Sequence, residues 1–121
     1  MPVSVGAISA RLGDKLVYQG TATATADTDV TAAAASVYVV DIDNTLNSTP
    51  VYLKLYDTAS VTTGTTAIVG CYKGEPSSRT IYHITAGIAF GTALSFACTK
   101  EAGSAGSTSP TNSVVVRLIV T

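Results

Sequence analysis

The chain has 121 residues, of which 46% are hydrophobic and 12% charged, with a formal net charge of −1. This size corresponds to one domain with a sizeable core, and the composition excludes a disordered chain or a basic nucleic-acid-binding domain. Because no unbroken apolar run exceeds four residues, the sequence holds no candidate membrane span.

Residues 1–13 read as an N-terminal arm rather than as part of the domain. They contain four larger aliphatic side chains spread among Gly, Ala and Ser: Val3, Val5, Ile8 and Leu12. Four such side chains bury too little surface to offset the entropy of ordering the segment on its own. We therefore expect the arm to contact another protein chain through these residues.

From residue 14 onward, β-branched Val, Ile and Thr dominate, and helix-favouring composition is confined to residues 32–35. Alternating segments predict strands at 14–19, 21–26, 36–42, 50–57, 66–73, 78–84, 88–98 and 113–120. The segment 88–98 is either one long strand or a pair of strands kinked at Gly91. About seven to nine short strands separated by turn residues predict an antiparallel β-sandwich, jelly-roll or Ig-like, over residues 14–121.

The alternation is clearest at residues 50–57 and 113–120. Aliphatic residues recur there at every second position, which is typical of a strand with one buried face. The predicted core includes Leu53, Leu55, Val116 and Leu118. The residues that alternate with the first two, Tyr52, Lys54 and Tyr56, are expected to line a half-exposed face.

Few residues suggest chemistry. Cys71 and Cys98 are expected to be free thiols, because residues 1–20 lack the pattern of a secretory signal and point to a reducing compartment. His83 is the only histidine, so the chain cannot complete a four-ligand zinc site with two cysteines. In an alternating strand, His83 reads as a core-edge or surface residue rather than as the base of a catalytic triad. We expect no cofactor, no catalytic residues and no enzymatic activity.

The acidic run at 41–44, DIDN, resembles the start of a calcium loop. An EF-hand would need Gly and Glu where Leu46 and Tyr52 stand, so turn capping is favoured over a loose calcium site formed by Asp41, Asp43 and Asn44. The sequon at Asn47 likewise reads as turn chemistry. Six tyrosines alternate with aliphatic residues, which indicates sheet surface and leaves carbohydrate binding as an alternative.

Two segments resemble a known family. They are residues 50–67, PVYLKLYDTASVTTGTTA, and residues 83–118, HITAGIAFGTALSFACTKEAGSAGSTSPTNSVVVRL. A YLKLYD strand, a Thr/Gly loop, a GIAFGTALSFA strand and a small-residue loop before a terminal aliphatic strand resemble small structural proteins of tailed-bacteriophage virions. The resemblance implies a virion component with a β-sandwich fold, and the N-terminal third of the chain does not share it.

The resemblance leads us to expect a capsid decoration or cement protein on the capsid exterior, made in the host cytoplasm. A mean hydropathy of +0.37 and aliphatic residues on both faces of 113–120 fit a surface covered by partners. The expected partners are the major capsid protein or another virion protein, and further copies of this chain in a dimer or trimer. A tail or baseplate protein and a carbohydrate-binding module are the alternatives.

Overall fold

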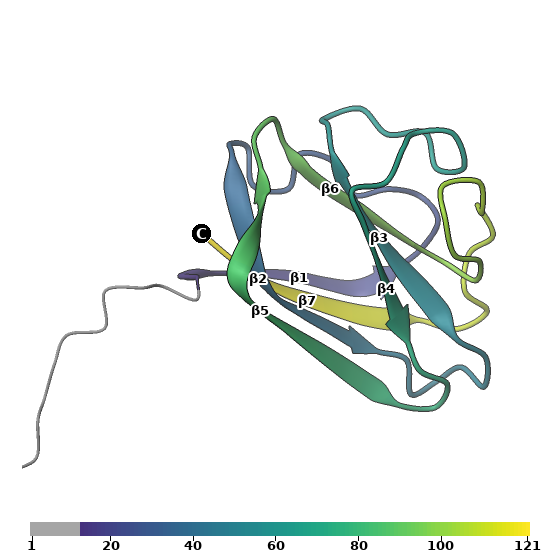
Figure 1. The fold of residues 1–121 in the computed structure, drawn as a ribbon. Coiled ribbons are helices and arrows are strands. Elements are labelled where there is room, and N and C mark those ends of the chain that lie inside the picture. The colour runs from purple at the N-terminus through teal and green to yellow at the C-terminus, as the bar shows by residue number, and fades with distance from the viewer. Residues whose placement is uncertain (1–12) are drawn as a thin grey trace, which may run out of the picture.

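The structure, a computed structural model, describes residues 13–121, in which seven strands and no helix are present. Sheet A contains, in spatial order, β1 (Lys15–Ala22), β7 (Val114–Val120), β2 (Ala35–Asp43) and β5 (Arg79–Phe90). Sheet B contains β4 (Gly70–Gly74), β3 (Val51–Asp57) and β6 (Leu94–Thr99) in that order. All neighbouring strands are antiparallel, and the sheets form two layers (Figure 1). The predicted all-β antiparallel fold is therefore confirmed.

Two strand pairs organise the two layers. β2 pairs with β5 in sheet A, and β3 pairs with β6 in sheet B, as the second and fifth and the third and sixth strands do in the immunoglobulin fold. The last strand departs from that fold, because β7 lies between β1 and β2 instead of beside β6. The result is a sandwich of four strands against three with an Ig-like centre.

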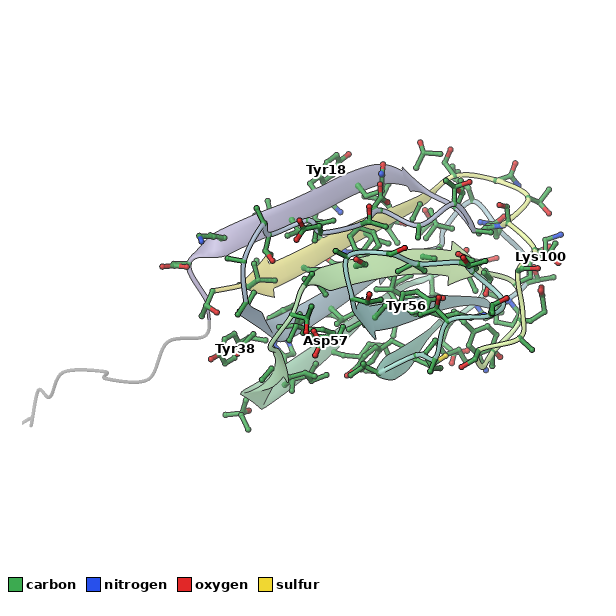
Figure 2. The ribbon with its side chains drawn as sticks, turned by 90° about the horizontal axis from the view of Figure 1, so that it is seen from above. Tyr18, Tyr38, Tyr56, Asp57 and Lys100 are labelled. Carbon is green, nitrogen blue, oxygen red and sulfur yellow. The ribbon has the colours of Figure 1, made fainter. Side chains whose placement is uncertain are left out.

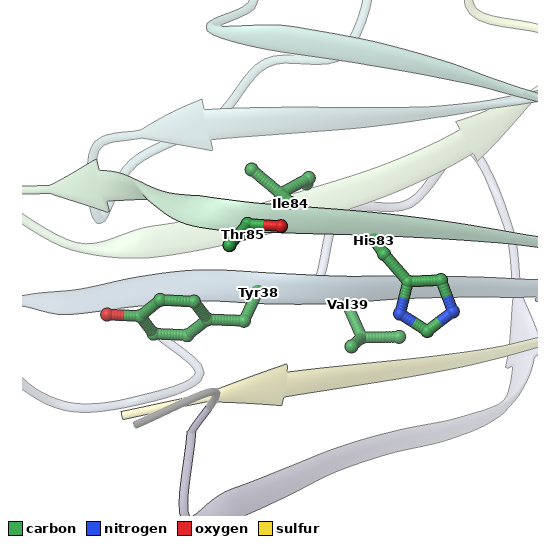
Figure 3. A pocket seen from close by; sticks show the side chains of 5 residues that line it. All are labelled: Tyr38, Val39, His83, Ile84 and Thr85. Carbon is green, nitrogen blue, oxygen red and sulfur yellow. The ribbon is translucent and has the colours of Figure 1, made fainter. Parts of the chain in front are cut away.

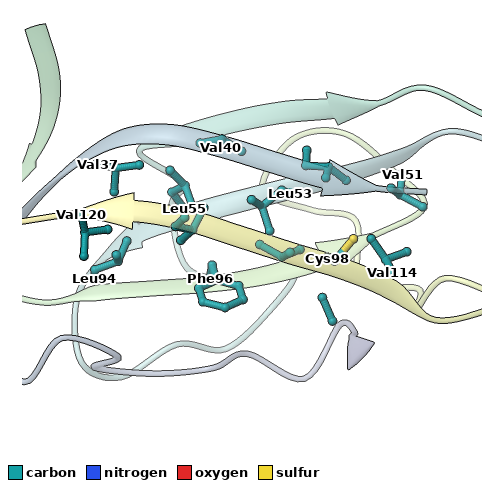
Figure 4. Packing of buried hydrophobic residues seen from close by; sticks show 14 of the residues in the cluster. Val37, Val40, Val51, Leu53, Leu55, Leu94, Phe96, Cys98, Val114 and Val120 are labelled. Carbon is teal, nitrogen blue, oxygen red and sulfur yellow. The ribbon is translucent and has the colours of Figure 1, made fainter. Parts of the chain in front are cut away.

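The core lies between the sheets and is built from alternate residues of the strands. The predicted core residues Leu53, Leu55, Val116 and Leu118 are all fully buried. Phe90, the last residue of β5, and Phe96 on β6 also belong to this cluster. Figure 4 shows Phe96 within it. The period of two therefore assigned the faces of β3 and β7 correctly.

The predicted strand at 21–26 is wrong beyond its first two residues, because β1 ends at Ala22. The following segment runs along the free edge of β6 instead. The amide of Cys98 donates to the Thr23 carbonyl at 2.8 Å, and Asp27 and Phe96 exchange two backbone hydrogen bonds of 2.9 Å. This irregular segment pairs with backbone N–H and C=O groups of β6 that would otherwise be unpaired at the edge of sheet B.

The segment predicted at 88–98 is a pair of strands, β5 and β6, joined by a turn at residues 91–93. The carboxylate of Asp57, at the end of β3, accepts hydrogen bonds from three amides of this turn. The donors are Thr92 at 2.9 Å, Ala93 at 3.2 Å and Gly91 at 3.3 Å. These donors, Thr92 first, hold the pKa of Asp57 below its ordinary value. Asp57 thereby fixes the connection between the two sheets.

The prediction that Lys54 and Tyr56 line a half-exposed face is wrong, because both side chains are fully buried. The loop of residues 100–112 reaches Lys54 on the outer side of sheet B. Lys54 Nζ donates a hydrogen bond of 2.8 Å to the carbonyl of Gly106, at the middle of this loop. Burial lowers the pKa of Lys54. The loop is thus anchored on a buried ammonium group rather than lying free in solvent.

Asn47 joins three loops at one end of the sandwich and is only 4% exposed. Its side chain donates to Asn44 Oδ1 at 2.9 Å and accepts from the amide of Asn112 at 2.8 Å. Its carbonyl accepts from the amide of Ser77 at 2.8 Å. The side-chain amide of the sequon is therefore used by the fold, which agrees with the prediction of turn chemistry.

Candidate functional site

The outer face of sheet A, the side that faces away from the core, carries three of the exposed large hydrophobic residues. Two neighbouring rows of paired residues cross it, each taking one residue from β1, β7, β2 and β5: Leu16, Ile119, Val39 and His83, then Tyr18, Arg117, Asp41 and Ile81. The side chains of Leu16 and Tyr18 are each 59% exposed, and that of Ile81 is 47% exposed. Figure 2 shows Tyr18 on the outer side of β1. Exposed apolar side chains gathered on one face in this way are typical of interaction surfaces.

Charged groups occupy the middle of this face, and Asp41 forms an ion pair with Arg79. Asp41, only 6% exposed, accepts a hydrogen bond of 2.9 Å from Arg79 Nε and a second one from Arg79 Nη2. The guanidinium of Arg117 lies 5.2 Å from the centre of the Tyr18 ring, in a cation–π contact. One of its nitrogens, Nη1, is buried with no hydrogen-bond partner among the described residues. The face therefore combines an aromatic residue, two arginines and aliphatic residues, the composition favoured in protein interfaces.

The carboxylates of the acidic run at 41–44 form hydrogen bonds with neighbouring side chains and backbone. Asp41 pairs with Arg79, and Asp43 Oδ1 accepts hydrogen bonds from the amide and the hydroxyl of Thr45 at 3.2 and 2.7 Å. The Thr45 bonds lower the pKa of Asp43. The two Thr45 bonds are the turn capping predicted as the alternative to a calcium loop, whereas Asp41 and Arg79 form an ion pair between β2 and β5. Within residues 13–121, no three His, Cys, Asp or Glu side chains are grouped to hold a metal ion.

A pocket of about 100 Å³ opens where the pairing of β2 and β5 changes register. Its lining consists of Tyr38, Val39, His83, Ile84 and Thr85 (Figure 3). The register passes from Val37 opposite Ile88 to Val39 opposite His83, so β5 bulges at this point. The pocket is well below the roughly 300–1,000 Å³ typical of small-molecule sites. It is large enough for one side chain.

His83 lies at the rim of this pocket and is exposed. None of the other four lining residues carries a carboxylate or a thiol. The pocket therefore supplies no acidic partner that would orient the imidazole as a general base. The alternating strand predicted a position for His83 either at the edge of the core or on the surface. The structure places His83 on the surface of sheet A.

The two cysteines lie on opposite sides of sheet B. Cys98 on β6 is paired with Leu53 and is fully buried in the core, whereas Cys71 on β4 is paired with Lys54 and is exposed. Both are free thiols. Burial raises the pKa of Cys98 to about 12. A disulfide between them would require one sulfur to cross the sheet.

This arrangement predicts unequal reactivity of the two thiols. In the folded protein at neutral pH, a maleimide should label Cys71 alone, because the thiolate is the nucleophile and Cys98 is both buried and protonated. Mass spectrometry should find one label in native buffer and two after unfolding in denaturant. Two labels at equal rates in native buffer would contradict the burial of Cys98, and no label after unfolding would indicate a disulfide.

The tyrosines are distributed over both sheets rather than gathered into one platform. Tyr72 on β4 and Tyr82 on β5 close one side of the sandwich with an edge-to-face contact at 5.1 Å. The hydroxyl of Tyr82 donates to the Lys73 carbonyl at 2.6 Å. With Tyr56 buried and Tyr18 stacked on Arg117, these rings are engaged in packing. The favoured prediction for the tyrosines was sheet surface, which holds for Tyr18, whereas Tyr56 is buried.

The four arm residues predicted to contact a partner, Val3, Val5, Ile8 and Leu12, lie outside the described residues. No helix in the described part of the chain is both long and apolar enough to cross a membrane. A scan against protein-family models and a search of curated proteins both found no match to this chain.

Proposed function

We propose that this chain is a non-enzymatic structural protein of a tailed-phage particle, acting as a decoration or cement protein on the exterior of the capsid. The observation that carries this proposal is the outer face of sheet A, on which Leu16, Tyr18 and Ile81 are exposed around an Asp41–Arg79 ion pair and Arg117. Such a face suits docking on another protein more than binding a small molecule.

The composition supports assembly in many copies. A net charge of −1 limits repulsion between neighbouring subunits on a lattice. Each contact can be weak, because a subunit that touches several lattice positions, or several linked subunits, gains affinity through effective concentration. The proposed partners are the major capsid protein and other copies of this chain, arranged as a dimer or trimer that matches the local symmetry.

The test is reconstitution on phage particles that lack the protein. Leu16→Asp places a charge on the outer face of sheet A at a 59% exposed position, and Val69→Asp does the same at a 51% exposed position beside sheet B. We expect Leu16→Asp to reduce bound copies by about tenfold or more, as loss of an interface anchor does, and Val69→Asp to leave occupancy unchanged. Equal occupancy of the two variants would remove the outer face from the proposal.

The copy number per particle separates the capsid from the tail. Occupancy on the order of hundreds fits a capsid lattice, whereas about a dozen or fewer fits a tail or baseplate ring. The latter result would move the protein to the alternative location within the same virion.

The N-terminal arm gives a second prediction for the same assay. Deletion of residues 2–12 should leave the sandwich folded, because all seven strands and the buried cluster that the structure describes lie within residues 15–120. The deletion should lower occupancy on particles, since the arm is proposed to reach a neighbouring subunit by strand addition. Melting temperature and bound copies are measured together. A deletion variant that binds as well as the full chain would contradict a role for the arm.

A further inference from the structure

We propose that two copies of this chain pair through β1, antiparallel about a two-fold axis at Val17, so that sheet A continues from one copy into the other. The proposal deepens the proposed function, which expects further copies of this chain as partners, by assigning the surface between them. It depends on the open edge of β1, on the alternation of residues along that edge, and on the charges at the two ends of the paired stretch.

Of the strands that end the two described sheets, β1 has the open edge. β4 and β5 are joined across one side of the sandwich, where the Tyr82 hydroxyl donates to the Lys73 carbonyl. The outer edge of β6 is covered by the segment that pairs with it through Asp27. β1 has β7 on one side and no described strand on the other, and it forms one border of the molecule (Figure 2, purple). An edge of this kind is a template for strand addition.

The hydrogen bonds of β7 show which residues of β1 bond to it. The amide of Thr121 donates to the Ser36 carbonyl on the β2 side at 3.1 Å. Successive residues of a strand direct their N–H and C=O to opposite neighbours, so those of Val120 face β1. Lys15 is the residue paired with Val120, and its backbone therefore bonds to β7.

The regular part of β1 is symmetric about Val17. The register with β7 is unbroken from Lys15 to Gln19 and shifts after it. Within this stretch, Leu16 and Tyr18 direct their N–H and C=O to the open side, because they alternate with the residues that bond to β7. A two-fold axis at Val17 places Tyr18 of the second copy opposite Leu16, and each such pair exchanges both of its N–H···O bonds.

The same register brings opposite charges together. Lys15 is exposed and lies on the same face of β1 as Gln19, and the two-fold axis sets it opposite Gln19 of the second copy. Gln19 Nε2 donates to both carboxylate oxygens of Asp27, at 3.0 and 3.1 Å. Within residues 13–121, neither Lys15 nor Asp27 has an ion-pair partner. Each Lys15 ammonium therefore comes beside the Asp27 carboxylate of the other copy.

The outer face of sheet A becomes continuous across the axis. Leu16 and Tyr18, each 59% exposed in the single chain, lie beside Tyr18 and Leu16 of the second copy. Burial of these side chains against one another favours the pairing. Because the paired stretch is short, its area falls in the class of weak interfaces below about 1,200 Å². We expect a weak dimer that is populated at high local concentration, as between neighbouring copies on a particle.

Neighbouring registers lose these contacts. An axis at Leu16 sets Lys15 opposite Val17, and an axis at Tyr18 sets it opposite Thr21. In neither register does Lys15 lie opposite the residue that holds the Asp27 carboxylate. Both registers also extend the pairing beyond the regular stretch of β1.

Disulfide cross-linking tests the register. Residue 17 lies opposite itself at a position without direct backbone bonds, where Cα atoms are about 4.5 Å apart and a disulfide fits. Val17→Cys is made together with Cys71→Ser, which removes the exposed native thiol. Oxidation should give a covalent dimer. Thr21→Cys on the same background is the control, because Thr21 is exposed on the same strand but lies far from its own copy.

Charge exchange tests the ion pairs, with self-association of the full chain measured by sedimentation equilibrium. Lys15→Glu and Asp27→Lys should each weaken the dimer by about tenfold or more, because each sets like charges together at both ends of the paired strands. The double variant should restore the dimer, since the charges are again opposite. Lys100→Glu, in an exposed loop, should leave self-association unchanged. Circular dichroism confirms that each variant is folded.

A chain that stays monomeric at concentrations on the order of millimolar would overturn the proposal. So would Thr21→Cys that cross-links as readily as Val17→Cys, or a folded double variant that does not recover. The cross-linking does not involve Asp27, so it decides the matter if Asp27→Lys fails to fold. Neither measurement uses particles: a dimer that does not bind particles contradicts the proposed function alone, and a monomer that fills them contradicts the β1 pairing alone.

Discussion

Leu55→Ala should lower the free energy of unfolding by about 2–5 kcal/mol, the range for removing three carbon atoms from a packed interior. Leu55 is fully buried on β3, the central strand of sheet B, and is paired on its two sides with Gly70 and Phe96. Because both neighbouring strands hold the backbone in place, the structure can collapse only partly into the space left by the substitution. Chemical denaturation monitored by circular dichroism measures the loss.

Leu16→Ala is the matched control, since Leu16 is 59% exposed on the edge strand β1. The same chemical change should cost less than about 0.5 kcal/mol there. A loss below that value at Leu55, or a comparable loss at both positions, would mean that the faces of the strands are reversed.

Lys54→Ala should lower the free energy of unfolding by about 2–5 kcal/mol, whereas Lys54→Met should cost less than about 1.5 kcal/mol. Alanine leaves the space of a long side chain empty beneath the loop of residues 100–112 and removes the 2.8 Å hydrogen bond to Gly106. Methionine removes the same bond, but it fills the space and relieves the cost of burying a charge. Equal losses for the two variants would show that the hydrogen bond, rather than packing, holds the loop.

The pH dependence of these proteins tests the buried charge directly. Burial lowers the pKa of Lys54 below the value of 10.5 that it has when exposed, so the unfolded chain binds more protons between the two values. The contribution of Lys54 to the free energy of unfolding should therefore rise with pH between the pKa of Lys54 in the folded protein and 10.5. Below the folded-state pKa, this contribution should not change with pH. Subtracting the stability of Lys54→Met isolates this contribution from Cys98, whose raised pKa acts in the opposite direction above pH 9.0. A difference that does not change with pH would contradict a buried ammonium.

The sequence could predict the faces of the strands but not what covers them. The alternation at 51–57 directs Leu53 and Leu55 to the core, because side chains on a strand alternate between its two sides. It places Lys54 on the other side, where a lysine is ordinarily exposed. The loop that buries Lys54 begins more than forty residues later in the chain. No local pattern at 50–57 carries that information.

The end of β1 and the turn between β5 and β6 also depend on contacts with residues that are distant in the sequence. The segment TATATA alternates as well as any strand, but beyond Ala22 it follows the edge of β6, roughly seventy residues away. The turn between β5 and β6 is held by hydrogen bonds from its amides to the carboxylate of Asp57, which belongs to β3. In both places a contact across the sandwich decides a structure that local propensity leaves open.

The outer face of sheet A could not be predicted for a related reason. Its two rows exist only because β7 lies between β1 and β2, which brings Arg117 beside Asp41 and beneath Tyr18. The sequence identified the apolar character of both faces of 113–120, and hence surface in need of a partner, but not the strands beside it. The residues that it assigned to partner contacts, Val3, Val5, Ile8 and Leu12, stay a prediction.

The position of β7 also sets the order in which sheet A can form. β1 has no neighbouring strand in the sheet other than β7, and their pairing joins Val17 to Leu118 across most of the chain. During synthesis, β1 must therefore wait for nearly the whole polypeptide to leave the ribosome before it gains a partner. Closing so long a loop before any pairing can form is entropically costly, which places this domain among the slowly folding topologies, on the scale of about milliseconds to seconds. Over that interval β1 and the adjacent side of β2 are open edges, so a chaperone or rapid assembly would matter most for this protein before its last strand is in place.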